Sequence, residues 1–320
     1  MSPHPAGAIL AHVTRPRRHL LSIADLGDDD LRHLVERGLE HARGAARPAQ
    51  PLRGLVVGIY FRKTSTRTRT AFSSGALRLG AGIVSYGPDD LQENTGESVE
   101  DTGRVLARML DALVARTAGS PGELRTLAAR GRLSVINAMT ADEHPTQAIA
   151  DLTTMLGRFG SIEGLRVLYV GEGNNTAAAL ALALARYRGA ELHLRTPPGY
   201  GLERERLEAA RCAAARGGAR VEERHDLALL PEDVDVVYTT RWRTTGTVKA
   251  DPRWLDVFAP FHVGAPLMER YPRAAFMHDL PAHRGEEVAA EVLDGPASIA
   301  FDQAENKLHS AMAVLEWCLS

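Results

Sequence analysis

The sequence predicts an α/β protein with two doubly wound parallel-sheet domains and an interdomain active-site cleft. Short apolar runs alternate with longer helical patterns along the whole chain, an order typical of parallel strands covered by helices. The apolar pattern also begins anew at Leu165–Gly171, directly after a long helical segment. A chain of 320 residues, 44% of them hydrophobic, can bury the cores of two such domains.

The first domain is expected to span residues 1–146 and to contain four buried strands. Each strand is a short, mostly apolar run; the four are Leu55–Tyr60, Gly82–Tyr86, Ala112–Ala115 and Leu133–Ala138. Helical patterns accompany them over about Asp28–Arg43, Thr66–Leu79 and Ser98–Met109. The first helix opens with three consecutive aspartates, which stabilise a helix N-terminus.

The second domain is expected to span residues 147–302. A helix over about Pro145–Gly157 links it to the first domain, and its strands are expected at Leu165–Gly171, Glu191–Arg195, Val234–Thr239 and Ala275–His278. A last helix within residues 303–320 is expected to pack back on the first domain. Because ligands bind at the carboxyl ends of parallel strands, polar residues at those ends are the candidate site residues.

Composition excludes several classes of protein. The formal net charge of −2 argues against a general nucleic-acid binder, and no apolar run approaches the roughly 20 residues that span a bilayer. The first 18 residues lack the pattern of a secretion signal. Cys212 and Cys318 lie far apart without metal-ligand spacing, so neither a disulfide framework nor a metal site is expected, and a reducing cytoplasm is implied.

A loop rich in hydroxyl groups and arginine follows the first predicted strand. In the stretch YFRKTSTRTRTAF, Ser65, Thr66, Arg67 and Thr68 stand where a helix begins. Backbone N–H groups, hydroxyls and a guanidinium around one point favour an anion, and a phosphate in particular. The plainer alternative is an ordinary capped helix start, but a cap needs only one hydroxyl. Arg69 is expected to point away from the ligand and to be structural.

Three further stretches fit the same chemistry. Arg116 ends a predicted strand, HPTQ places His144 and Gln147 at the linking helix, and HDLP follows the last strand of the second domain. Together with STRTR at Ser65, these motifs resemble the aspartate/ornithine carbamoyltransferase family, and most closely its ornithine-type branch. The resemblance runs from about Arg18 to the C-terminal stretch FDQAENKLHSAMAVL.

The resemblance implies a site for carbamoyl phosphate. Ser65, Thr66, Arg67 and Thr68 would hold the phosphate, Arg116, His144 and Thr68 would polarise the carbonyl oxygen, and Gln147 would hold the carbamoyl amide. Leu280, in a cis peptide bond with Pro281, and Lys307 would complete the amide end. Arg116 as a salt-bridged strand end and His144 as a helix cap are the plainer alternatives.

The resemblance also implies a homotrimer with active sites shared between subunits. Gln92 matches the residue that the family inserts from a neighbouring subunit. The family's lysine four residues later is replaced by Gly96.

The acceptor side of the site departs from the ornithine pattern. Asn174 and Asn175 fit the pattern, but Thr240 replaces its aspartate, Asp279 replaces its cysteine and Lys307 replaces its arginine. The remaining acceptor candidates are Arg241, Arg243, Thr244 and Thr245. Without a carboxylate at Thr240, the sequence predicts that the acceptor is not free ornithine but another small amine, such as a diamino acid or a peptide-linked diaminopropionyl unit in a specialised pathway.

The predicted activity is therefore carbamoyl transfer from carbamoyl phosphate to a primary amine, with Arg67, Arg116, His144 and Asp279 as catalytic residues. Asp279 is expected to orient the attacking amine, to accept its proton or to pair with Lys307. The alternatives are a true ornithine or aspartate carbamoyltransferase, and a non-catalytic regulatory paralogue that only binds carbamoyl phosphate. No metal or organic cofactor is called for.

Overall fold

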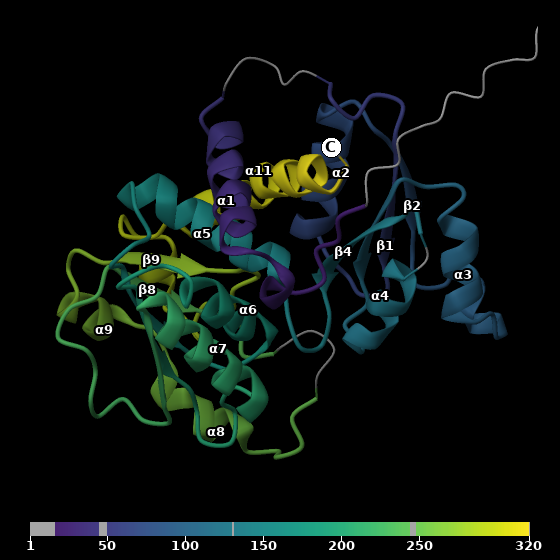
Figure 1. Cartoon of the computed structure of the whole chain (residues 1–320). Coiled ribbons are helices and arrows are strands. Elements are labelled where there is room, and N and C mark those ends of the chain that lie inside the picture. The colour runs from purple at the N-terminus through teal and green to yellow at the C-terminus, as the bar shows by residue number, and fades with distance from the viewer. Residues whose placement is uncertain (1–16, 45–49, 130, 244–247, 320) are drawn as a thin grey trace, which may run out of the picture.

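The computed structural model describes residues 17–44, 50–129, 131–243 and 248–319, and it contains two parallel sheets. The first sheet has the order β2-β1-β3-β4, and the second has the order β7-β6-β5-β8-β9. Helices lie around both sheets in Figure 1. The predicted fold class of two parallel-sheet α/β domains is confirmed.

The first sheet is built around β1, which pairs in parallel with β2 and β3. Its strands are β1 (Val56–Phe61), β2 (Gly82–Tyr86), β3 (Ala112–Arg116) and β4 (Ser134–Met139). The central strands are almost entirely buried, whereas β2 lies at the edge and is largely exposed. The other elements of this domain are η1 (Ile23–Asp25), α1 (Asp28–Ala42), α2 (Arg67–Arg78), η2 (Gln92–Thr95), α3 (Val99–Leu106) and α4 (Pro121–Ala128).

The second sheet is built around β5, which pairs in parallel with β6 and β8. Its strands are β5 (Arg166–Val170), β6 (Glu191–Arg195), β7 (Arg220–Arg224), β8 (Val236–Thr239) and β9 (Ala275–His278). The accompanying helices are α6 (Asn175–Leu184), α7 (Arg204–Gly217), α8 (Trp254–Phe258), η3 (Ala259–Phe261), α9 (Ala265–Arg270) and α10 (Ala290–Leu293).

Two long helices join the domains. The helix α5 (Pro145–Phe159) connects β4 to the second domain and packs against α1, α6 and β4. The last helix, α11 (Ala300–Leu319), leaves the second domain and packs against α1, α2 and α5 (Figure 1). Both helices are largely buried. The first domain thus contains both the beginning and the end of the described chain.

Every strand predicted from the sequence is present, with ends shifted by no more than two residues. The strand β7 was not predicted because its sequence, RVEER, is charged and lies at a sheet edge. The described cysteines, Cys212 and Cys318, are both free. Within the described part of the chain, no helix is long and apolar enough to cross a membrane.

Candidate active site

A pocket of about 220 Å³ lies where the two domains meet. The first domain contributes the loop after β1, the end of β3, the end of β4 and the start of α5. The second contributes the loops after β5, β8 and β9, and α11 reaches it from behind. The lining residues are Thr64, Ser65, Thr66, Arg67, Thr68, Arg116, Met139, His144, Gln147, Asn174, Asn175, Thr176, Thr240, Arg241, Asp279, Leu280, Pro281 and Lys307.

The hydroxyl-rich loop forms one end of this pocket. Helix α2 begins at Arg67, and the side chain of Thr66 makes no capping hydrogen bond within the described structure. The loop hydroxyls are therefore not accounted for by an ordinary helix cap. Arg69 instead stacks over the ring of Phe61 at 5.2 Å and donates to its carbonyl oxygen at 3.3 Å, which confirms its structural role.

Arg116 and His144 face the pocket from neighbouring strand ends. Burial, with a smaller contribution from Arg67, lowers the pKa of Arg116 to about 10. The Nε atom of Arg116 is buried and has no hydrogen-bond partner in the described structure, and no ion pair of Arg116 is found there. A salt-bridged strand end would have shown such a partner.

His144 occupies the position before α5, but its side chain makes no capping hydrogen bond in the described structure. Burial, then the charges of Arg116 and Lys307, hold the pKa of His144 well below its usual range, so the imidazole is neutral at pH 7. The ring nitrogen Nδ1 lies 3.3 Å from the hydroxyl of Thr146. A neutral ring in this place can donate one hydrogen bond without adding charge.

A buried polar network holds the amide of Gln147. Its Nε2 donates to Asp151 Oδ1 at 2.7 Å, and its Oε1 accepts from Lys307 Nζ. Asp151 is fully buried and also accepts from Gln303 Nε2 at 2.6 Å and from the hydroxyl of Tyr238 at 3.2 Å. Desolvation raises the pKa of Asp151 and lowers the pKa of Lys307. This network fixes which end of the Gln147 amide faces Lys307.

The asparagine pair lies at the start of α6. Asn174 Oδ1 accepts from the backbone of Thr176 at 3.0 Å, and Asn174 Nδ2 donates to Thr240 Oγ1 at 3.4 Å. Asn175 is buried and donates to the carbonyl oxygen of Thr140 at 2.8 Å. Asn175 therefore ties the second domain to the loop that leads to His144.

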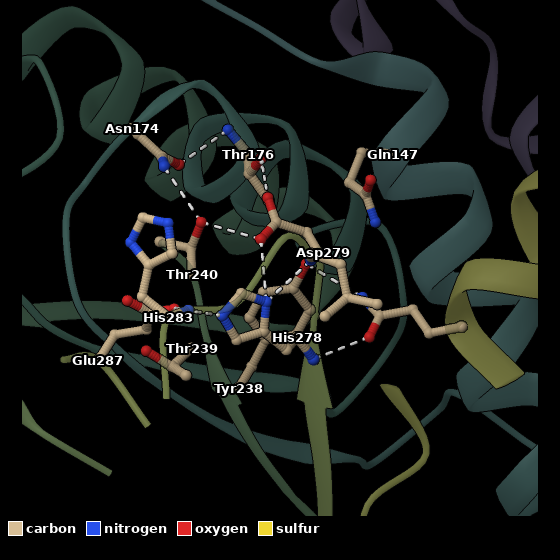
Figure 2. A network of polar contacts seen from close by, with 12 residues as sticks. Gln147, Asn174, Thr176, Tyr238, Thr239, Thr240, His278, Asp279, His283 and Glu287 are labelled. Atoms are coloured by element: carbon tan, nitrogen blue, oxygen red, sulfur yellow. Dashed lines mark hydrogen bonds and ion pairs between the residues drawn. The ribbon is translucent and has the colours of Figure 1, made fainter. Parts of the chain in front are cut away.

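Asp279 lies between two threonines. Its carboxylate accepts from Thr176 Oγ1 at 2.9 Å and from Thr240 Oγ1 at 3.0 Å, as Figure 2 shows. Lys307 contacts the backbone carbonyl oxygen of Asp279 at 2.9 Å, not its carboxylate. The carboxylate thus remains directed at the pocket, and the expected Asp279–Lys307 pair is not a side-chain ion pair.

This position of Asp279 corrects the expectation that the acceptor end of the pocket lacks a carboxylate near Thr240. Thr240 has no charge of its own, but a carboxylate oxygen lies 3.0 Å from its hydroxyl. The acceptor end of the pocket therefore has a negative charge, supplied from residue 279 and not from residue 240.

The turn that carries Asp279 is held by buried groups. His278 Nδ1 accepts from the backbone N–H of Leu280 at 2.8 Å, while His278 Nε2 lies 3.2 Å from Glu287 Oε1. The Leu280–Pro281 peptide bond is cis, as expected. Glu287, which Figure 2 shows beside His278 and His283, also accepts from the backbone N–H of His283. His278 and Glu287 therefore support the turn, and neither of them lines the pocket.

Some expected residues lie elsewhere. Gln92 is exposed in η2, accepts from the hydroxyl of Thr95 at 2.8 Å, and does not line the pocket of its own chain. Arg243 is exposed, lies 3.3 Å from Glu286 and stacks over Trp254 at 5.1 Å. The acceptor candidates Thr244 and Thr245 lie outside the described residues.

Sequence reasoning missed several residues. Thr64, Met139 and Thr176 line the pocket, and Asp151 lies behind it. The spacing of four residues between Gln147 and Asp151 on one helix was a usable signal, because such residues share a helix face. Thr176, in the first turn of α6, gives no comparable signal in the sequence.

Comparison with known proteins matches the two halves of the chain to two family domains. Residues 18–157 match the carbamoyl-P binding domain of aspartate/ornithine carbamoyltransferase, and residues 163–318 match its Asp/Orn binding domain. The chain belongs to the aspartate/ornithine carbamoyltransferase family.

Relatives in this family are similar over nearly their whole length. The ornithine carbamoyltransferase of Symbiobacterium thermophilum is 42% identical over 301 residues, 93% of this chain and 96% of the relative. That of Nitrosococcus oceani is 40% identical over 93% of this chain and 96% of its own.

Solved structures agree with this assignment. The ornithine carbamoyltransferase of Pyrococcus furiosus superposes with a TM-score of 0.90 at 36% identity, covering 96% of this chain and 98% of that one. The enzyme from Gloeobacter violaceus superposes with a TM-score of 0.84 at 36% identity, covering 96% of this chain and 100% of that one.

Proposed function

We propose that this carbamoyltransferase moves the carbamoyl group of carbamoyl phosphate to a primary amine of an ornithine-like diamino acid and releases phosphate. The observation that carries the proposal is the single pocket that unites Arg67, Arg116 and His144 of the first domain with Asn174 and Asp279 of the second. The residues of the first domain suit a phosphate and a carbonyl oxygen, and those of the second domain suit an amino-acid amine.

In the proposed complex, the N-terminus of α2, the loop hydroxyls and Arg67 bind the phosphate. Burial, offset by Asp279 and reinforced by Arg241, lowers the pKa of Arg67, which marks a cation that is incompletely solvated before an anion binds. A dianion at this helix start would offset that cost through charge-assisted hydrogen bonds.

At the other end of carbamoyl phosphate, Arg116 and His144 polarise the carbonyl oxygen, and Gln147 holds the amide. When the amine nitrogen attacks the carbonyl carbon, negative charge develops on that oxygen. Donors fixed in a dry site stabilise such an oxyanion without reorganising, and one donor is typically worth about 10²–10³ in rate. The carbon–oxygen bond to phosphate then breaks, and the phosphate leaves with the bonding electrons.

Asp279 is proposed to orient the attacking amine and to accept the proton that it loses. The two threonine hydroxyls hold the carboxylate in one orientation, and the family's cysteine at this place has no such charge. The role fits a carboxylate within hydrogen-bond reach of the amine.

Ornithine is the first candidate for the acceptor, because the similar proteins are named ornithine carbamoyltransferase. A different small amine remains the second candidate, because Thr240 stands where the ornithine pattern has an aspartate. The Asp279 carboxylate next to Thr240 provides a negative charge for an ammonium group of ornithine. This charge comes from a different residue than in the ornithine pattern.

The test is a phosphate-release assay with carbamoyl phosphate and ornithine, putrescine, aspartate, 2,3-diaminopropionate or α-N-acylated diamino acids, with product masses determined. Fastest carbamoylation of ornithine would establish the ornithine enzyme, and a clear preference for another amine would establish the second candidate. If carbamoyl phosphate binds but no amine yields product, the proposed activity is wrong, and a binding-only regulatory role replaces it.

The proposal includes a homotrimer with shared sites. Gln92 lies outside the pocket of its own chain, exposed on the surface, where a neighbouring subunit could receive it.

A further inference from the structure

A cluster of metal-ligand side chains lies outside the pocket, on the turn that follows Asp279. Among the described residues, His283, Glu286 and Glu287 are the one group of three histidine, cysteine or carboxylate side chains that are close enough to share an ion. One ligand atom of each lies within 4.8 Å of those of the other two. None of the three lines the pocket, so the proposed carbamoyl transfer does not account for them.

Glu287 is the fully buried member of this cluster, and one of its carboxylate oxygens has no partner. Its Oε1 accepts from the backbone N–H of His283 and lies 3.2 Å from His278 Nε2 (Figure 2). Its Oε2 is buried and makes no hydrogen bond in the described structure. An unpaired carboxylate oxygen is unfavourable in a protein interior, and a bound cation would offset that cost.

His283 has a second buried atom without a hydrogen bond. Its Nδ1 has no hydrogen-bond partner in the part of the chain that the structure describes, and it lies 3.5 Å from Glu286 Oε2. In a tetrahedral site with metal–ligand bonds of about 2.0–2.2 Å, two ligand atoms are about 3.3–3.6 Å apart. This nitrogen and this oxygen therefore already have the separation that a shared ion requires.

The backbone fixes the turn on which these side chains lie. The N–H of Gly285 donates to the carbonyl oxygen of Val288 at 2.8 Å, and the N–H of Glu286 donates to that of His283 at 2.9 Å. Gly285 has a φ of +87°, a conformation that glycine adopts without strain. The ligands are thus held near one another before an ion binds, which lowers the entropic cost of binding.

The types of ligand indicate the class of ion. One imidazole nitrogen with two carboxylates suits Zn²⁺ and related first-row divalent ions, whereas Mg²⁺ and Ca²⁺ prefer oxygen ligands alone. His283 and Glu286 are partly exposed, so an ion can enter from solvent and keep a water molecule as a further ligand. The cluster contains no cysteine, so cysteine spacing in the sequence could not reveal it.

We infer that His283, Glu286 and Glu287 bind one first-row divalent transition-metal ion of the Zn²⁺ class. The ion stabilises the turn that carries Asp279, because Glu287 is joined to that turn through His278. It takes no part in carbamoyl transfer, so the inference stands whichever amine is the acceptor.

Arg243 competes with the ion for Glu286. Its Nε lies 3.3 Å from Glu286 Oε2, the same oxygen that faces His283 Nδ1. A guanidinium and a divalent cation at one carboxylate oxygen repel each other. Arg243→Gln should therefore bind the ion more tightly than the unaltered protein does, by about two- to fivefold, as expected for an exposed charge.

Titration of the chelator-treated, full-length protein with Zn²⁺ in a calorimeter tests the site. We expect one tight site per chain, which an excess of Mg²⁺ does not block. His283→Gln and Glu286→Gln change partly exposed side chains and should stay folded. Each should weaken Zn²⁺ binding by at least about 100-fold, since loss of an outer-shell partner alone typically costs 10–100-fold. His33→Gln, which removes an exposed histidine from α1, is the matched control and should bind Zn²⁺ as the unaltered protein does.

Thermal unfolding gives a second measurement. Zn²⁺ should raise the melting temperature of the unaltered protein and of His33→Gln, but not that of Glu286→Gln. The inference is overturned if the unaltered protein has no tight site, or if His283→Gln and Glu286→Gln bind Zn²⁺ as tightly as it does. Weaker binding by Arg243→Gln, or loss of the tight site in His33→Gln, would also overturn it, because the ion would then lie elsewhere.

Discussion

Replacing Lys307 with methionine should change how the stability of the protein depends on pH. Lys307 is buried, and desolvation lowers its pKa from 10.5 to about 8, with Arg67 and Arg116 acting in the same direction and Asp279 and Asp151 opposing them. Methionine has a similar length and cannot carry the charge. The substitution therefore removes a titrating group without opening a large cavity.

The sign follows from proton binding. Between about pH 8 and pH 10.5 the unfolded chain binds more protons at Lys307 than the folded chain does, so folding becomes more favourable as pH rises through this window. The lowered pKa of Lys307 corresponds to a cost of about 3 kcal/mol near pH 7.5 that falls to about 1 kcal/mol near pH 9.5. The unaltered protein should gain about 2 kcal/mol relative to the variant over that interval.

Asp151 changes the stability difference between the two proteins in the same direction. Lys307 lowers the pKa of Asp151, which desolvation holds at about 7, so removing the lysine should raise it further. A carboxyl group whose pKa is raised by folding stabilises the protein less as pH increases through that pKa. The free energy of unfolding of the variant should therefore fall with rising pH, while that of the unaltered protein rises. Arg116 is present in both proteins, so its own contribution to the pH dependence largely cancels.

Urea denaturation of both proteins at about pH 7.5 and about pH 9.5 measures the difference. Lys307→Arg is the matched control, since arginine keeps its charge throughout the range. The difference in free energy of unfolding between Lys307→Arg and Lys307→Met should therefore be the same at both pH values. Parallel stability curves for the unaltered protein and Lys307→Met would refute the argument, because they would show that the lysine is not a buried, titrating cation.

Three further predictions concern the site and its support. Arg67→Ala should weaken carbamoyl phosphate binding by at least about 100-fold in calorimetry, whereas Arg69→Ala should bind normally at a temperature where it stays folded; equal affinities would remove Arg67 from the site. Gln92→Ala and Arg67→Ala should each be nearly inactive but recover part of the activity after mixing and reassembly, through sites that contain neither substitution; a monomer by sedimentation would contradict this. Gly173→Ala should destabilise the protein by roughly 3 kcal/mol or more in urea titrations, because the added Cβ would lie 2.3 Å from the backbone of Gly201; an unchanged midpoint would contradict it.

The sequence was most informative about the first domain. Its strands are short apolar runs, so the sequence predicts the loop at Ser65–Thr68 and Arg116 at strand ends and His144 at the start of the linking helix. The parallel topology then brings those ends to one edge of the sheet.

The sequence was less informative where contacts form between distant segments. Nothing in the chain indicates that the Asp279 carboxylate lies against Thr240, because 39 residues separate them and two strands must align first. The different surroundings of Arg241 and Arg243 likewise depend on side-chain direction, which a short irregular segment does not reveal. Helix α6 has no polar face because it is entirely buried, so its sequence lacks the periodicity that marks a surface helix.

The return of α11 to the first domain has a consequence for how the protein is made. Its buried side chains complete the surface against which α1, α2 and α5 pack, yet it follows all the other described elements along the chain. Domains generally fold as units from the N-terminus during synthesis at about 5–20 residues per second. Here the N-terminal domain stays unfinished until α11 leaves the ribosome, although all four strands of its sheet are made before the first strand of the second domain.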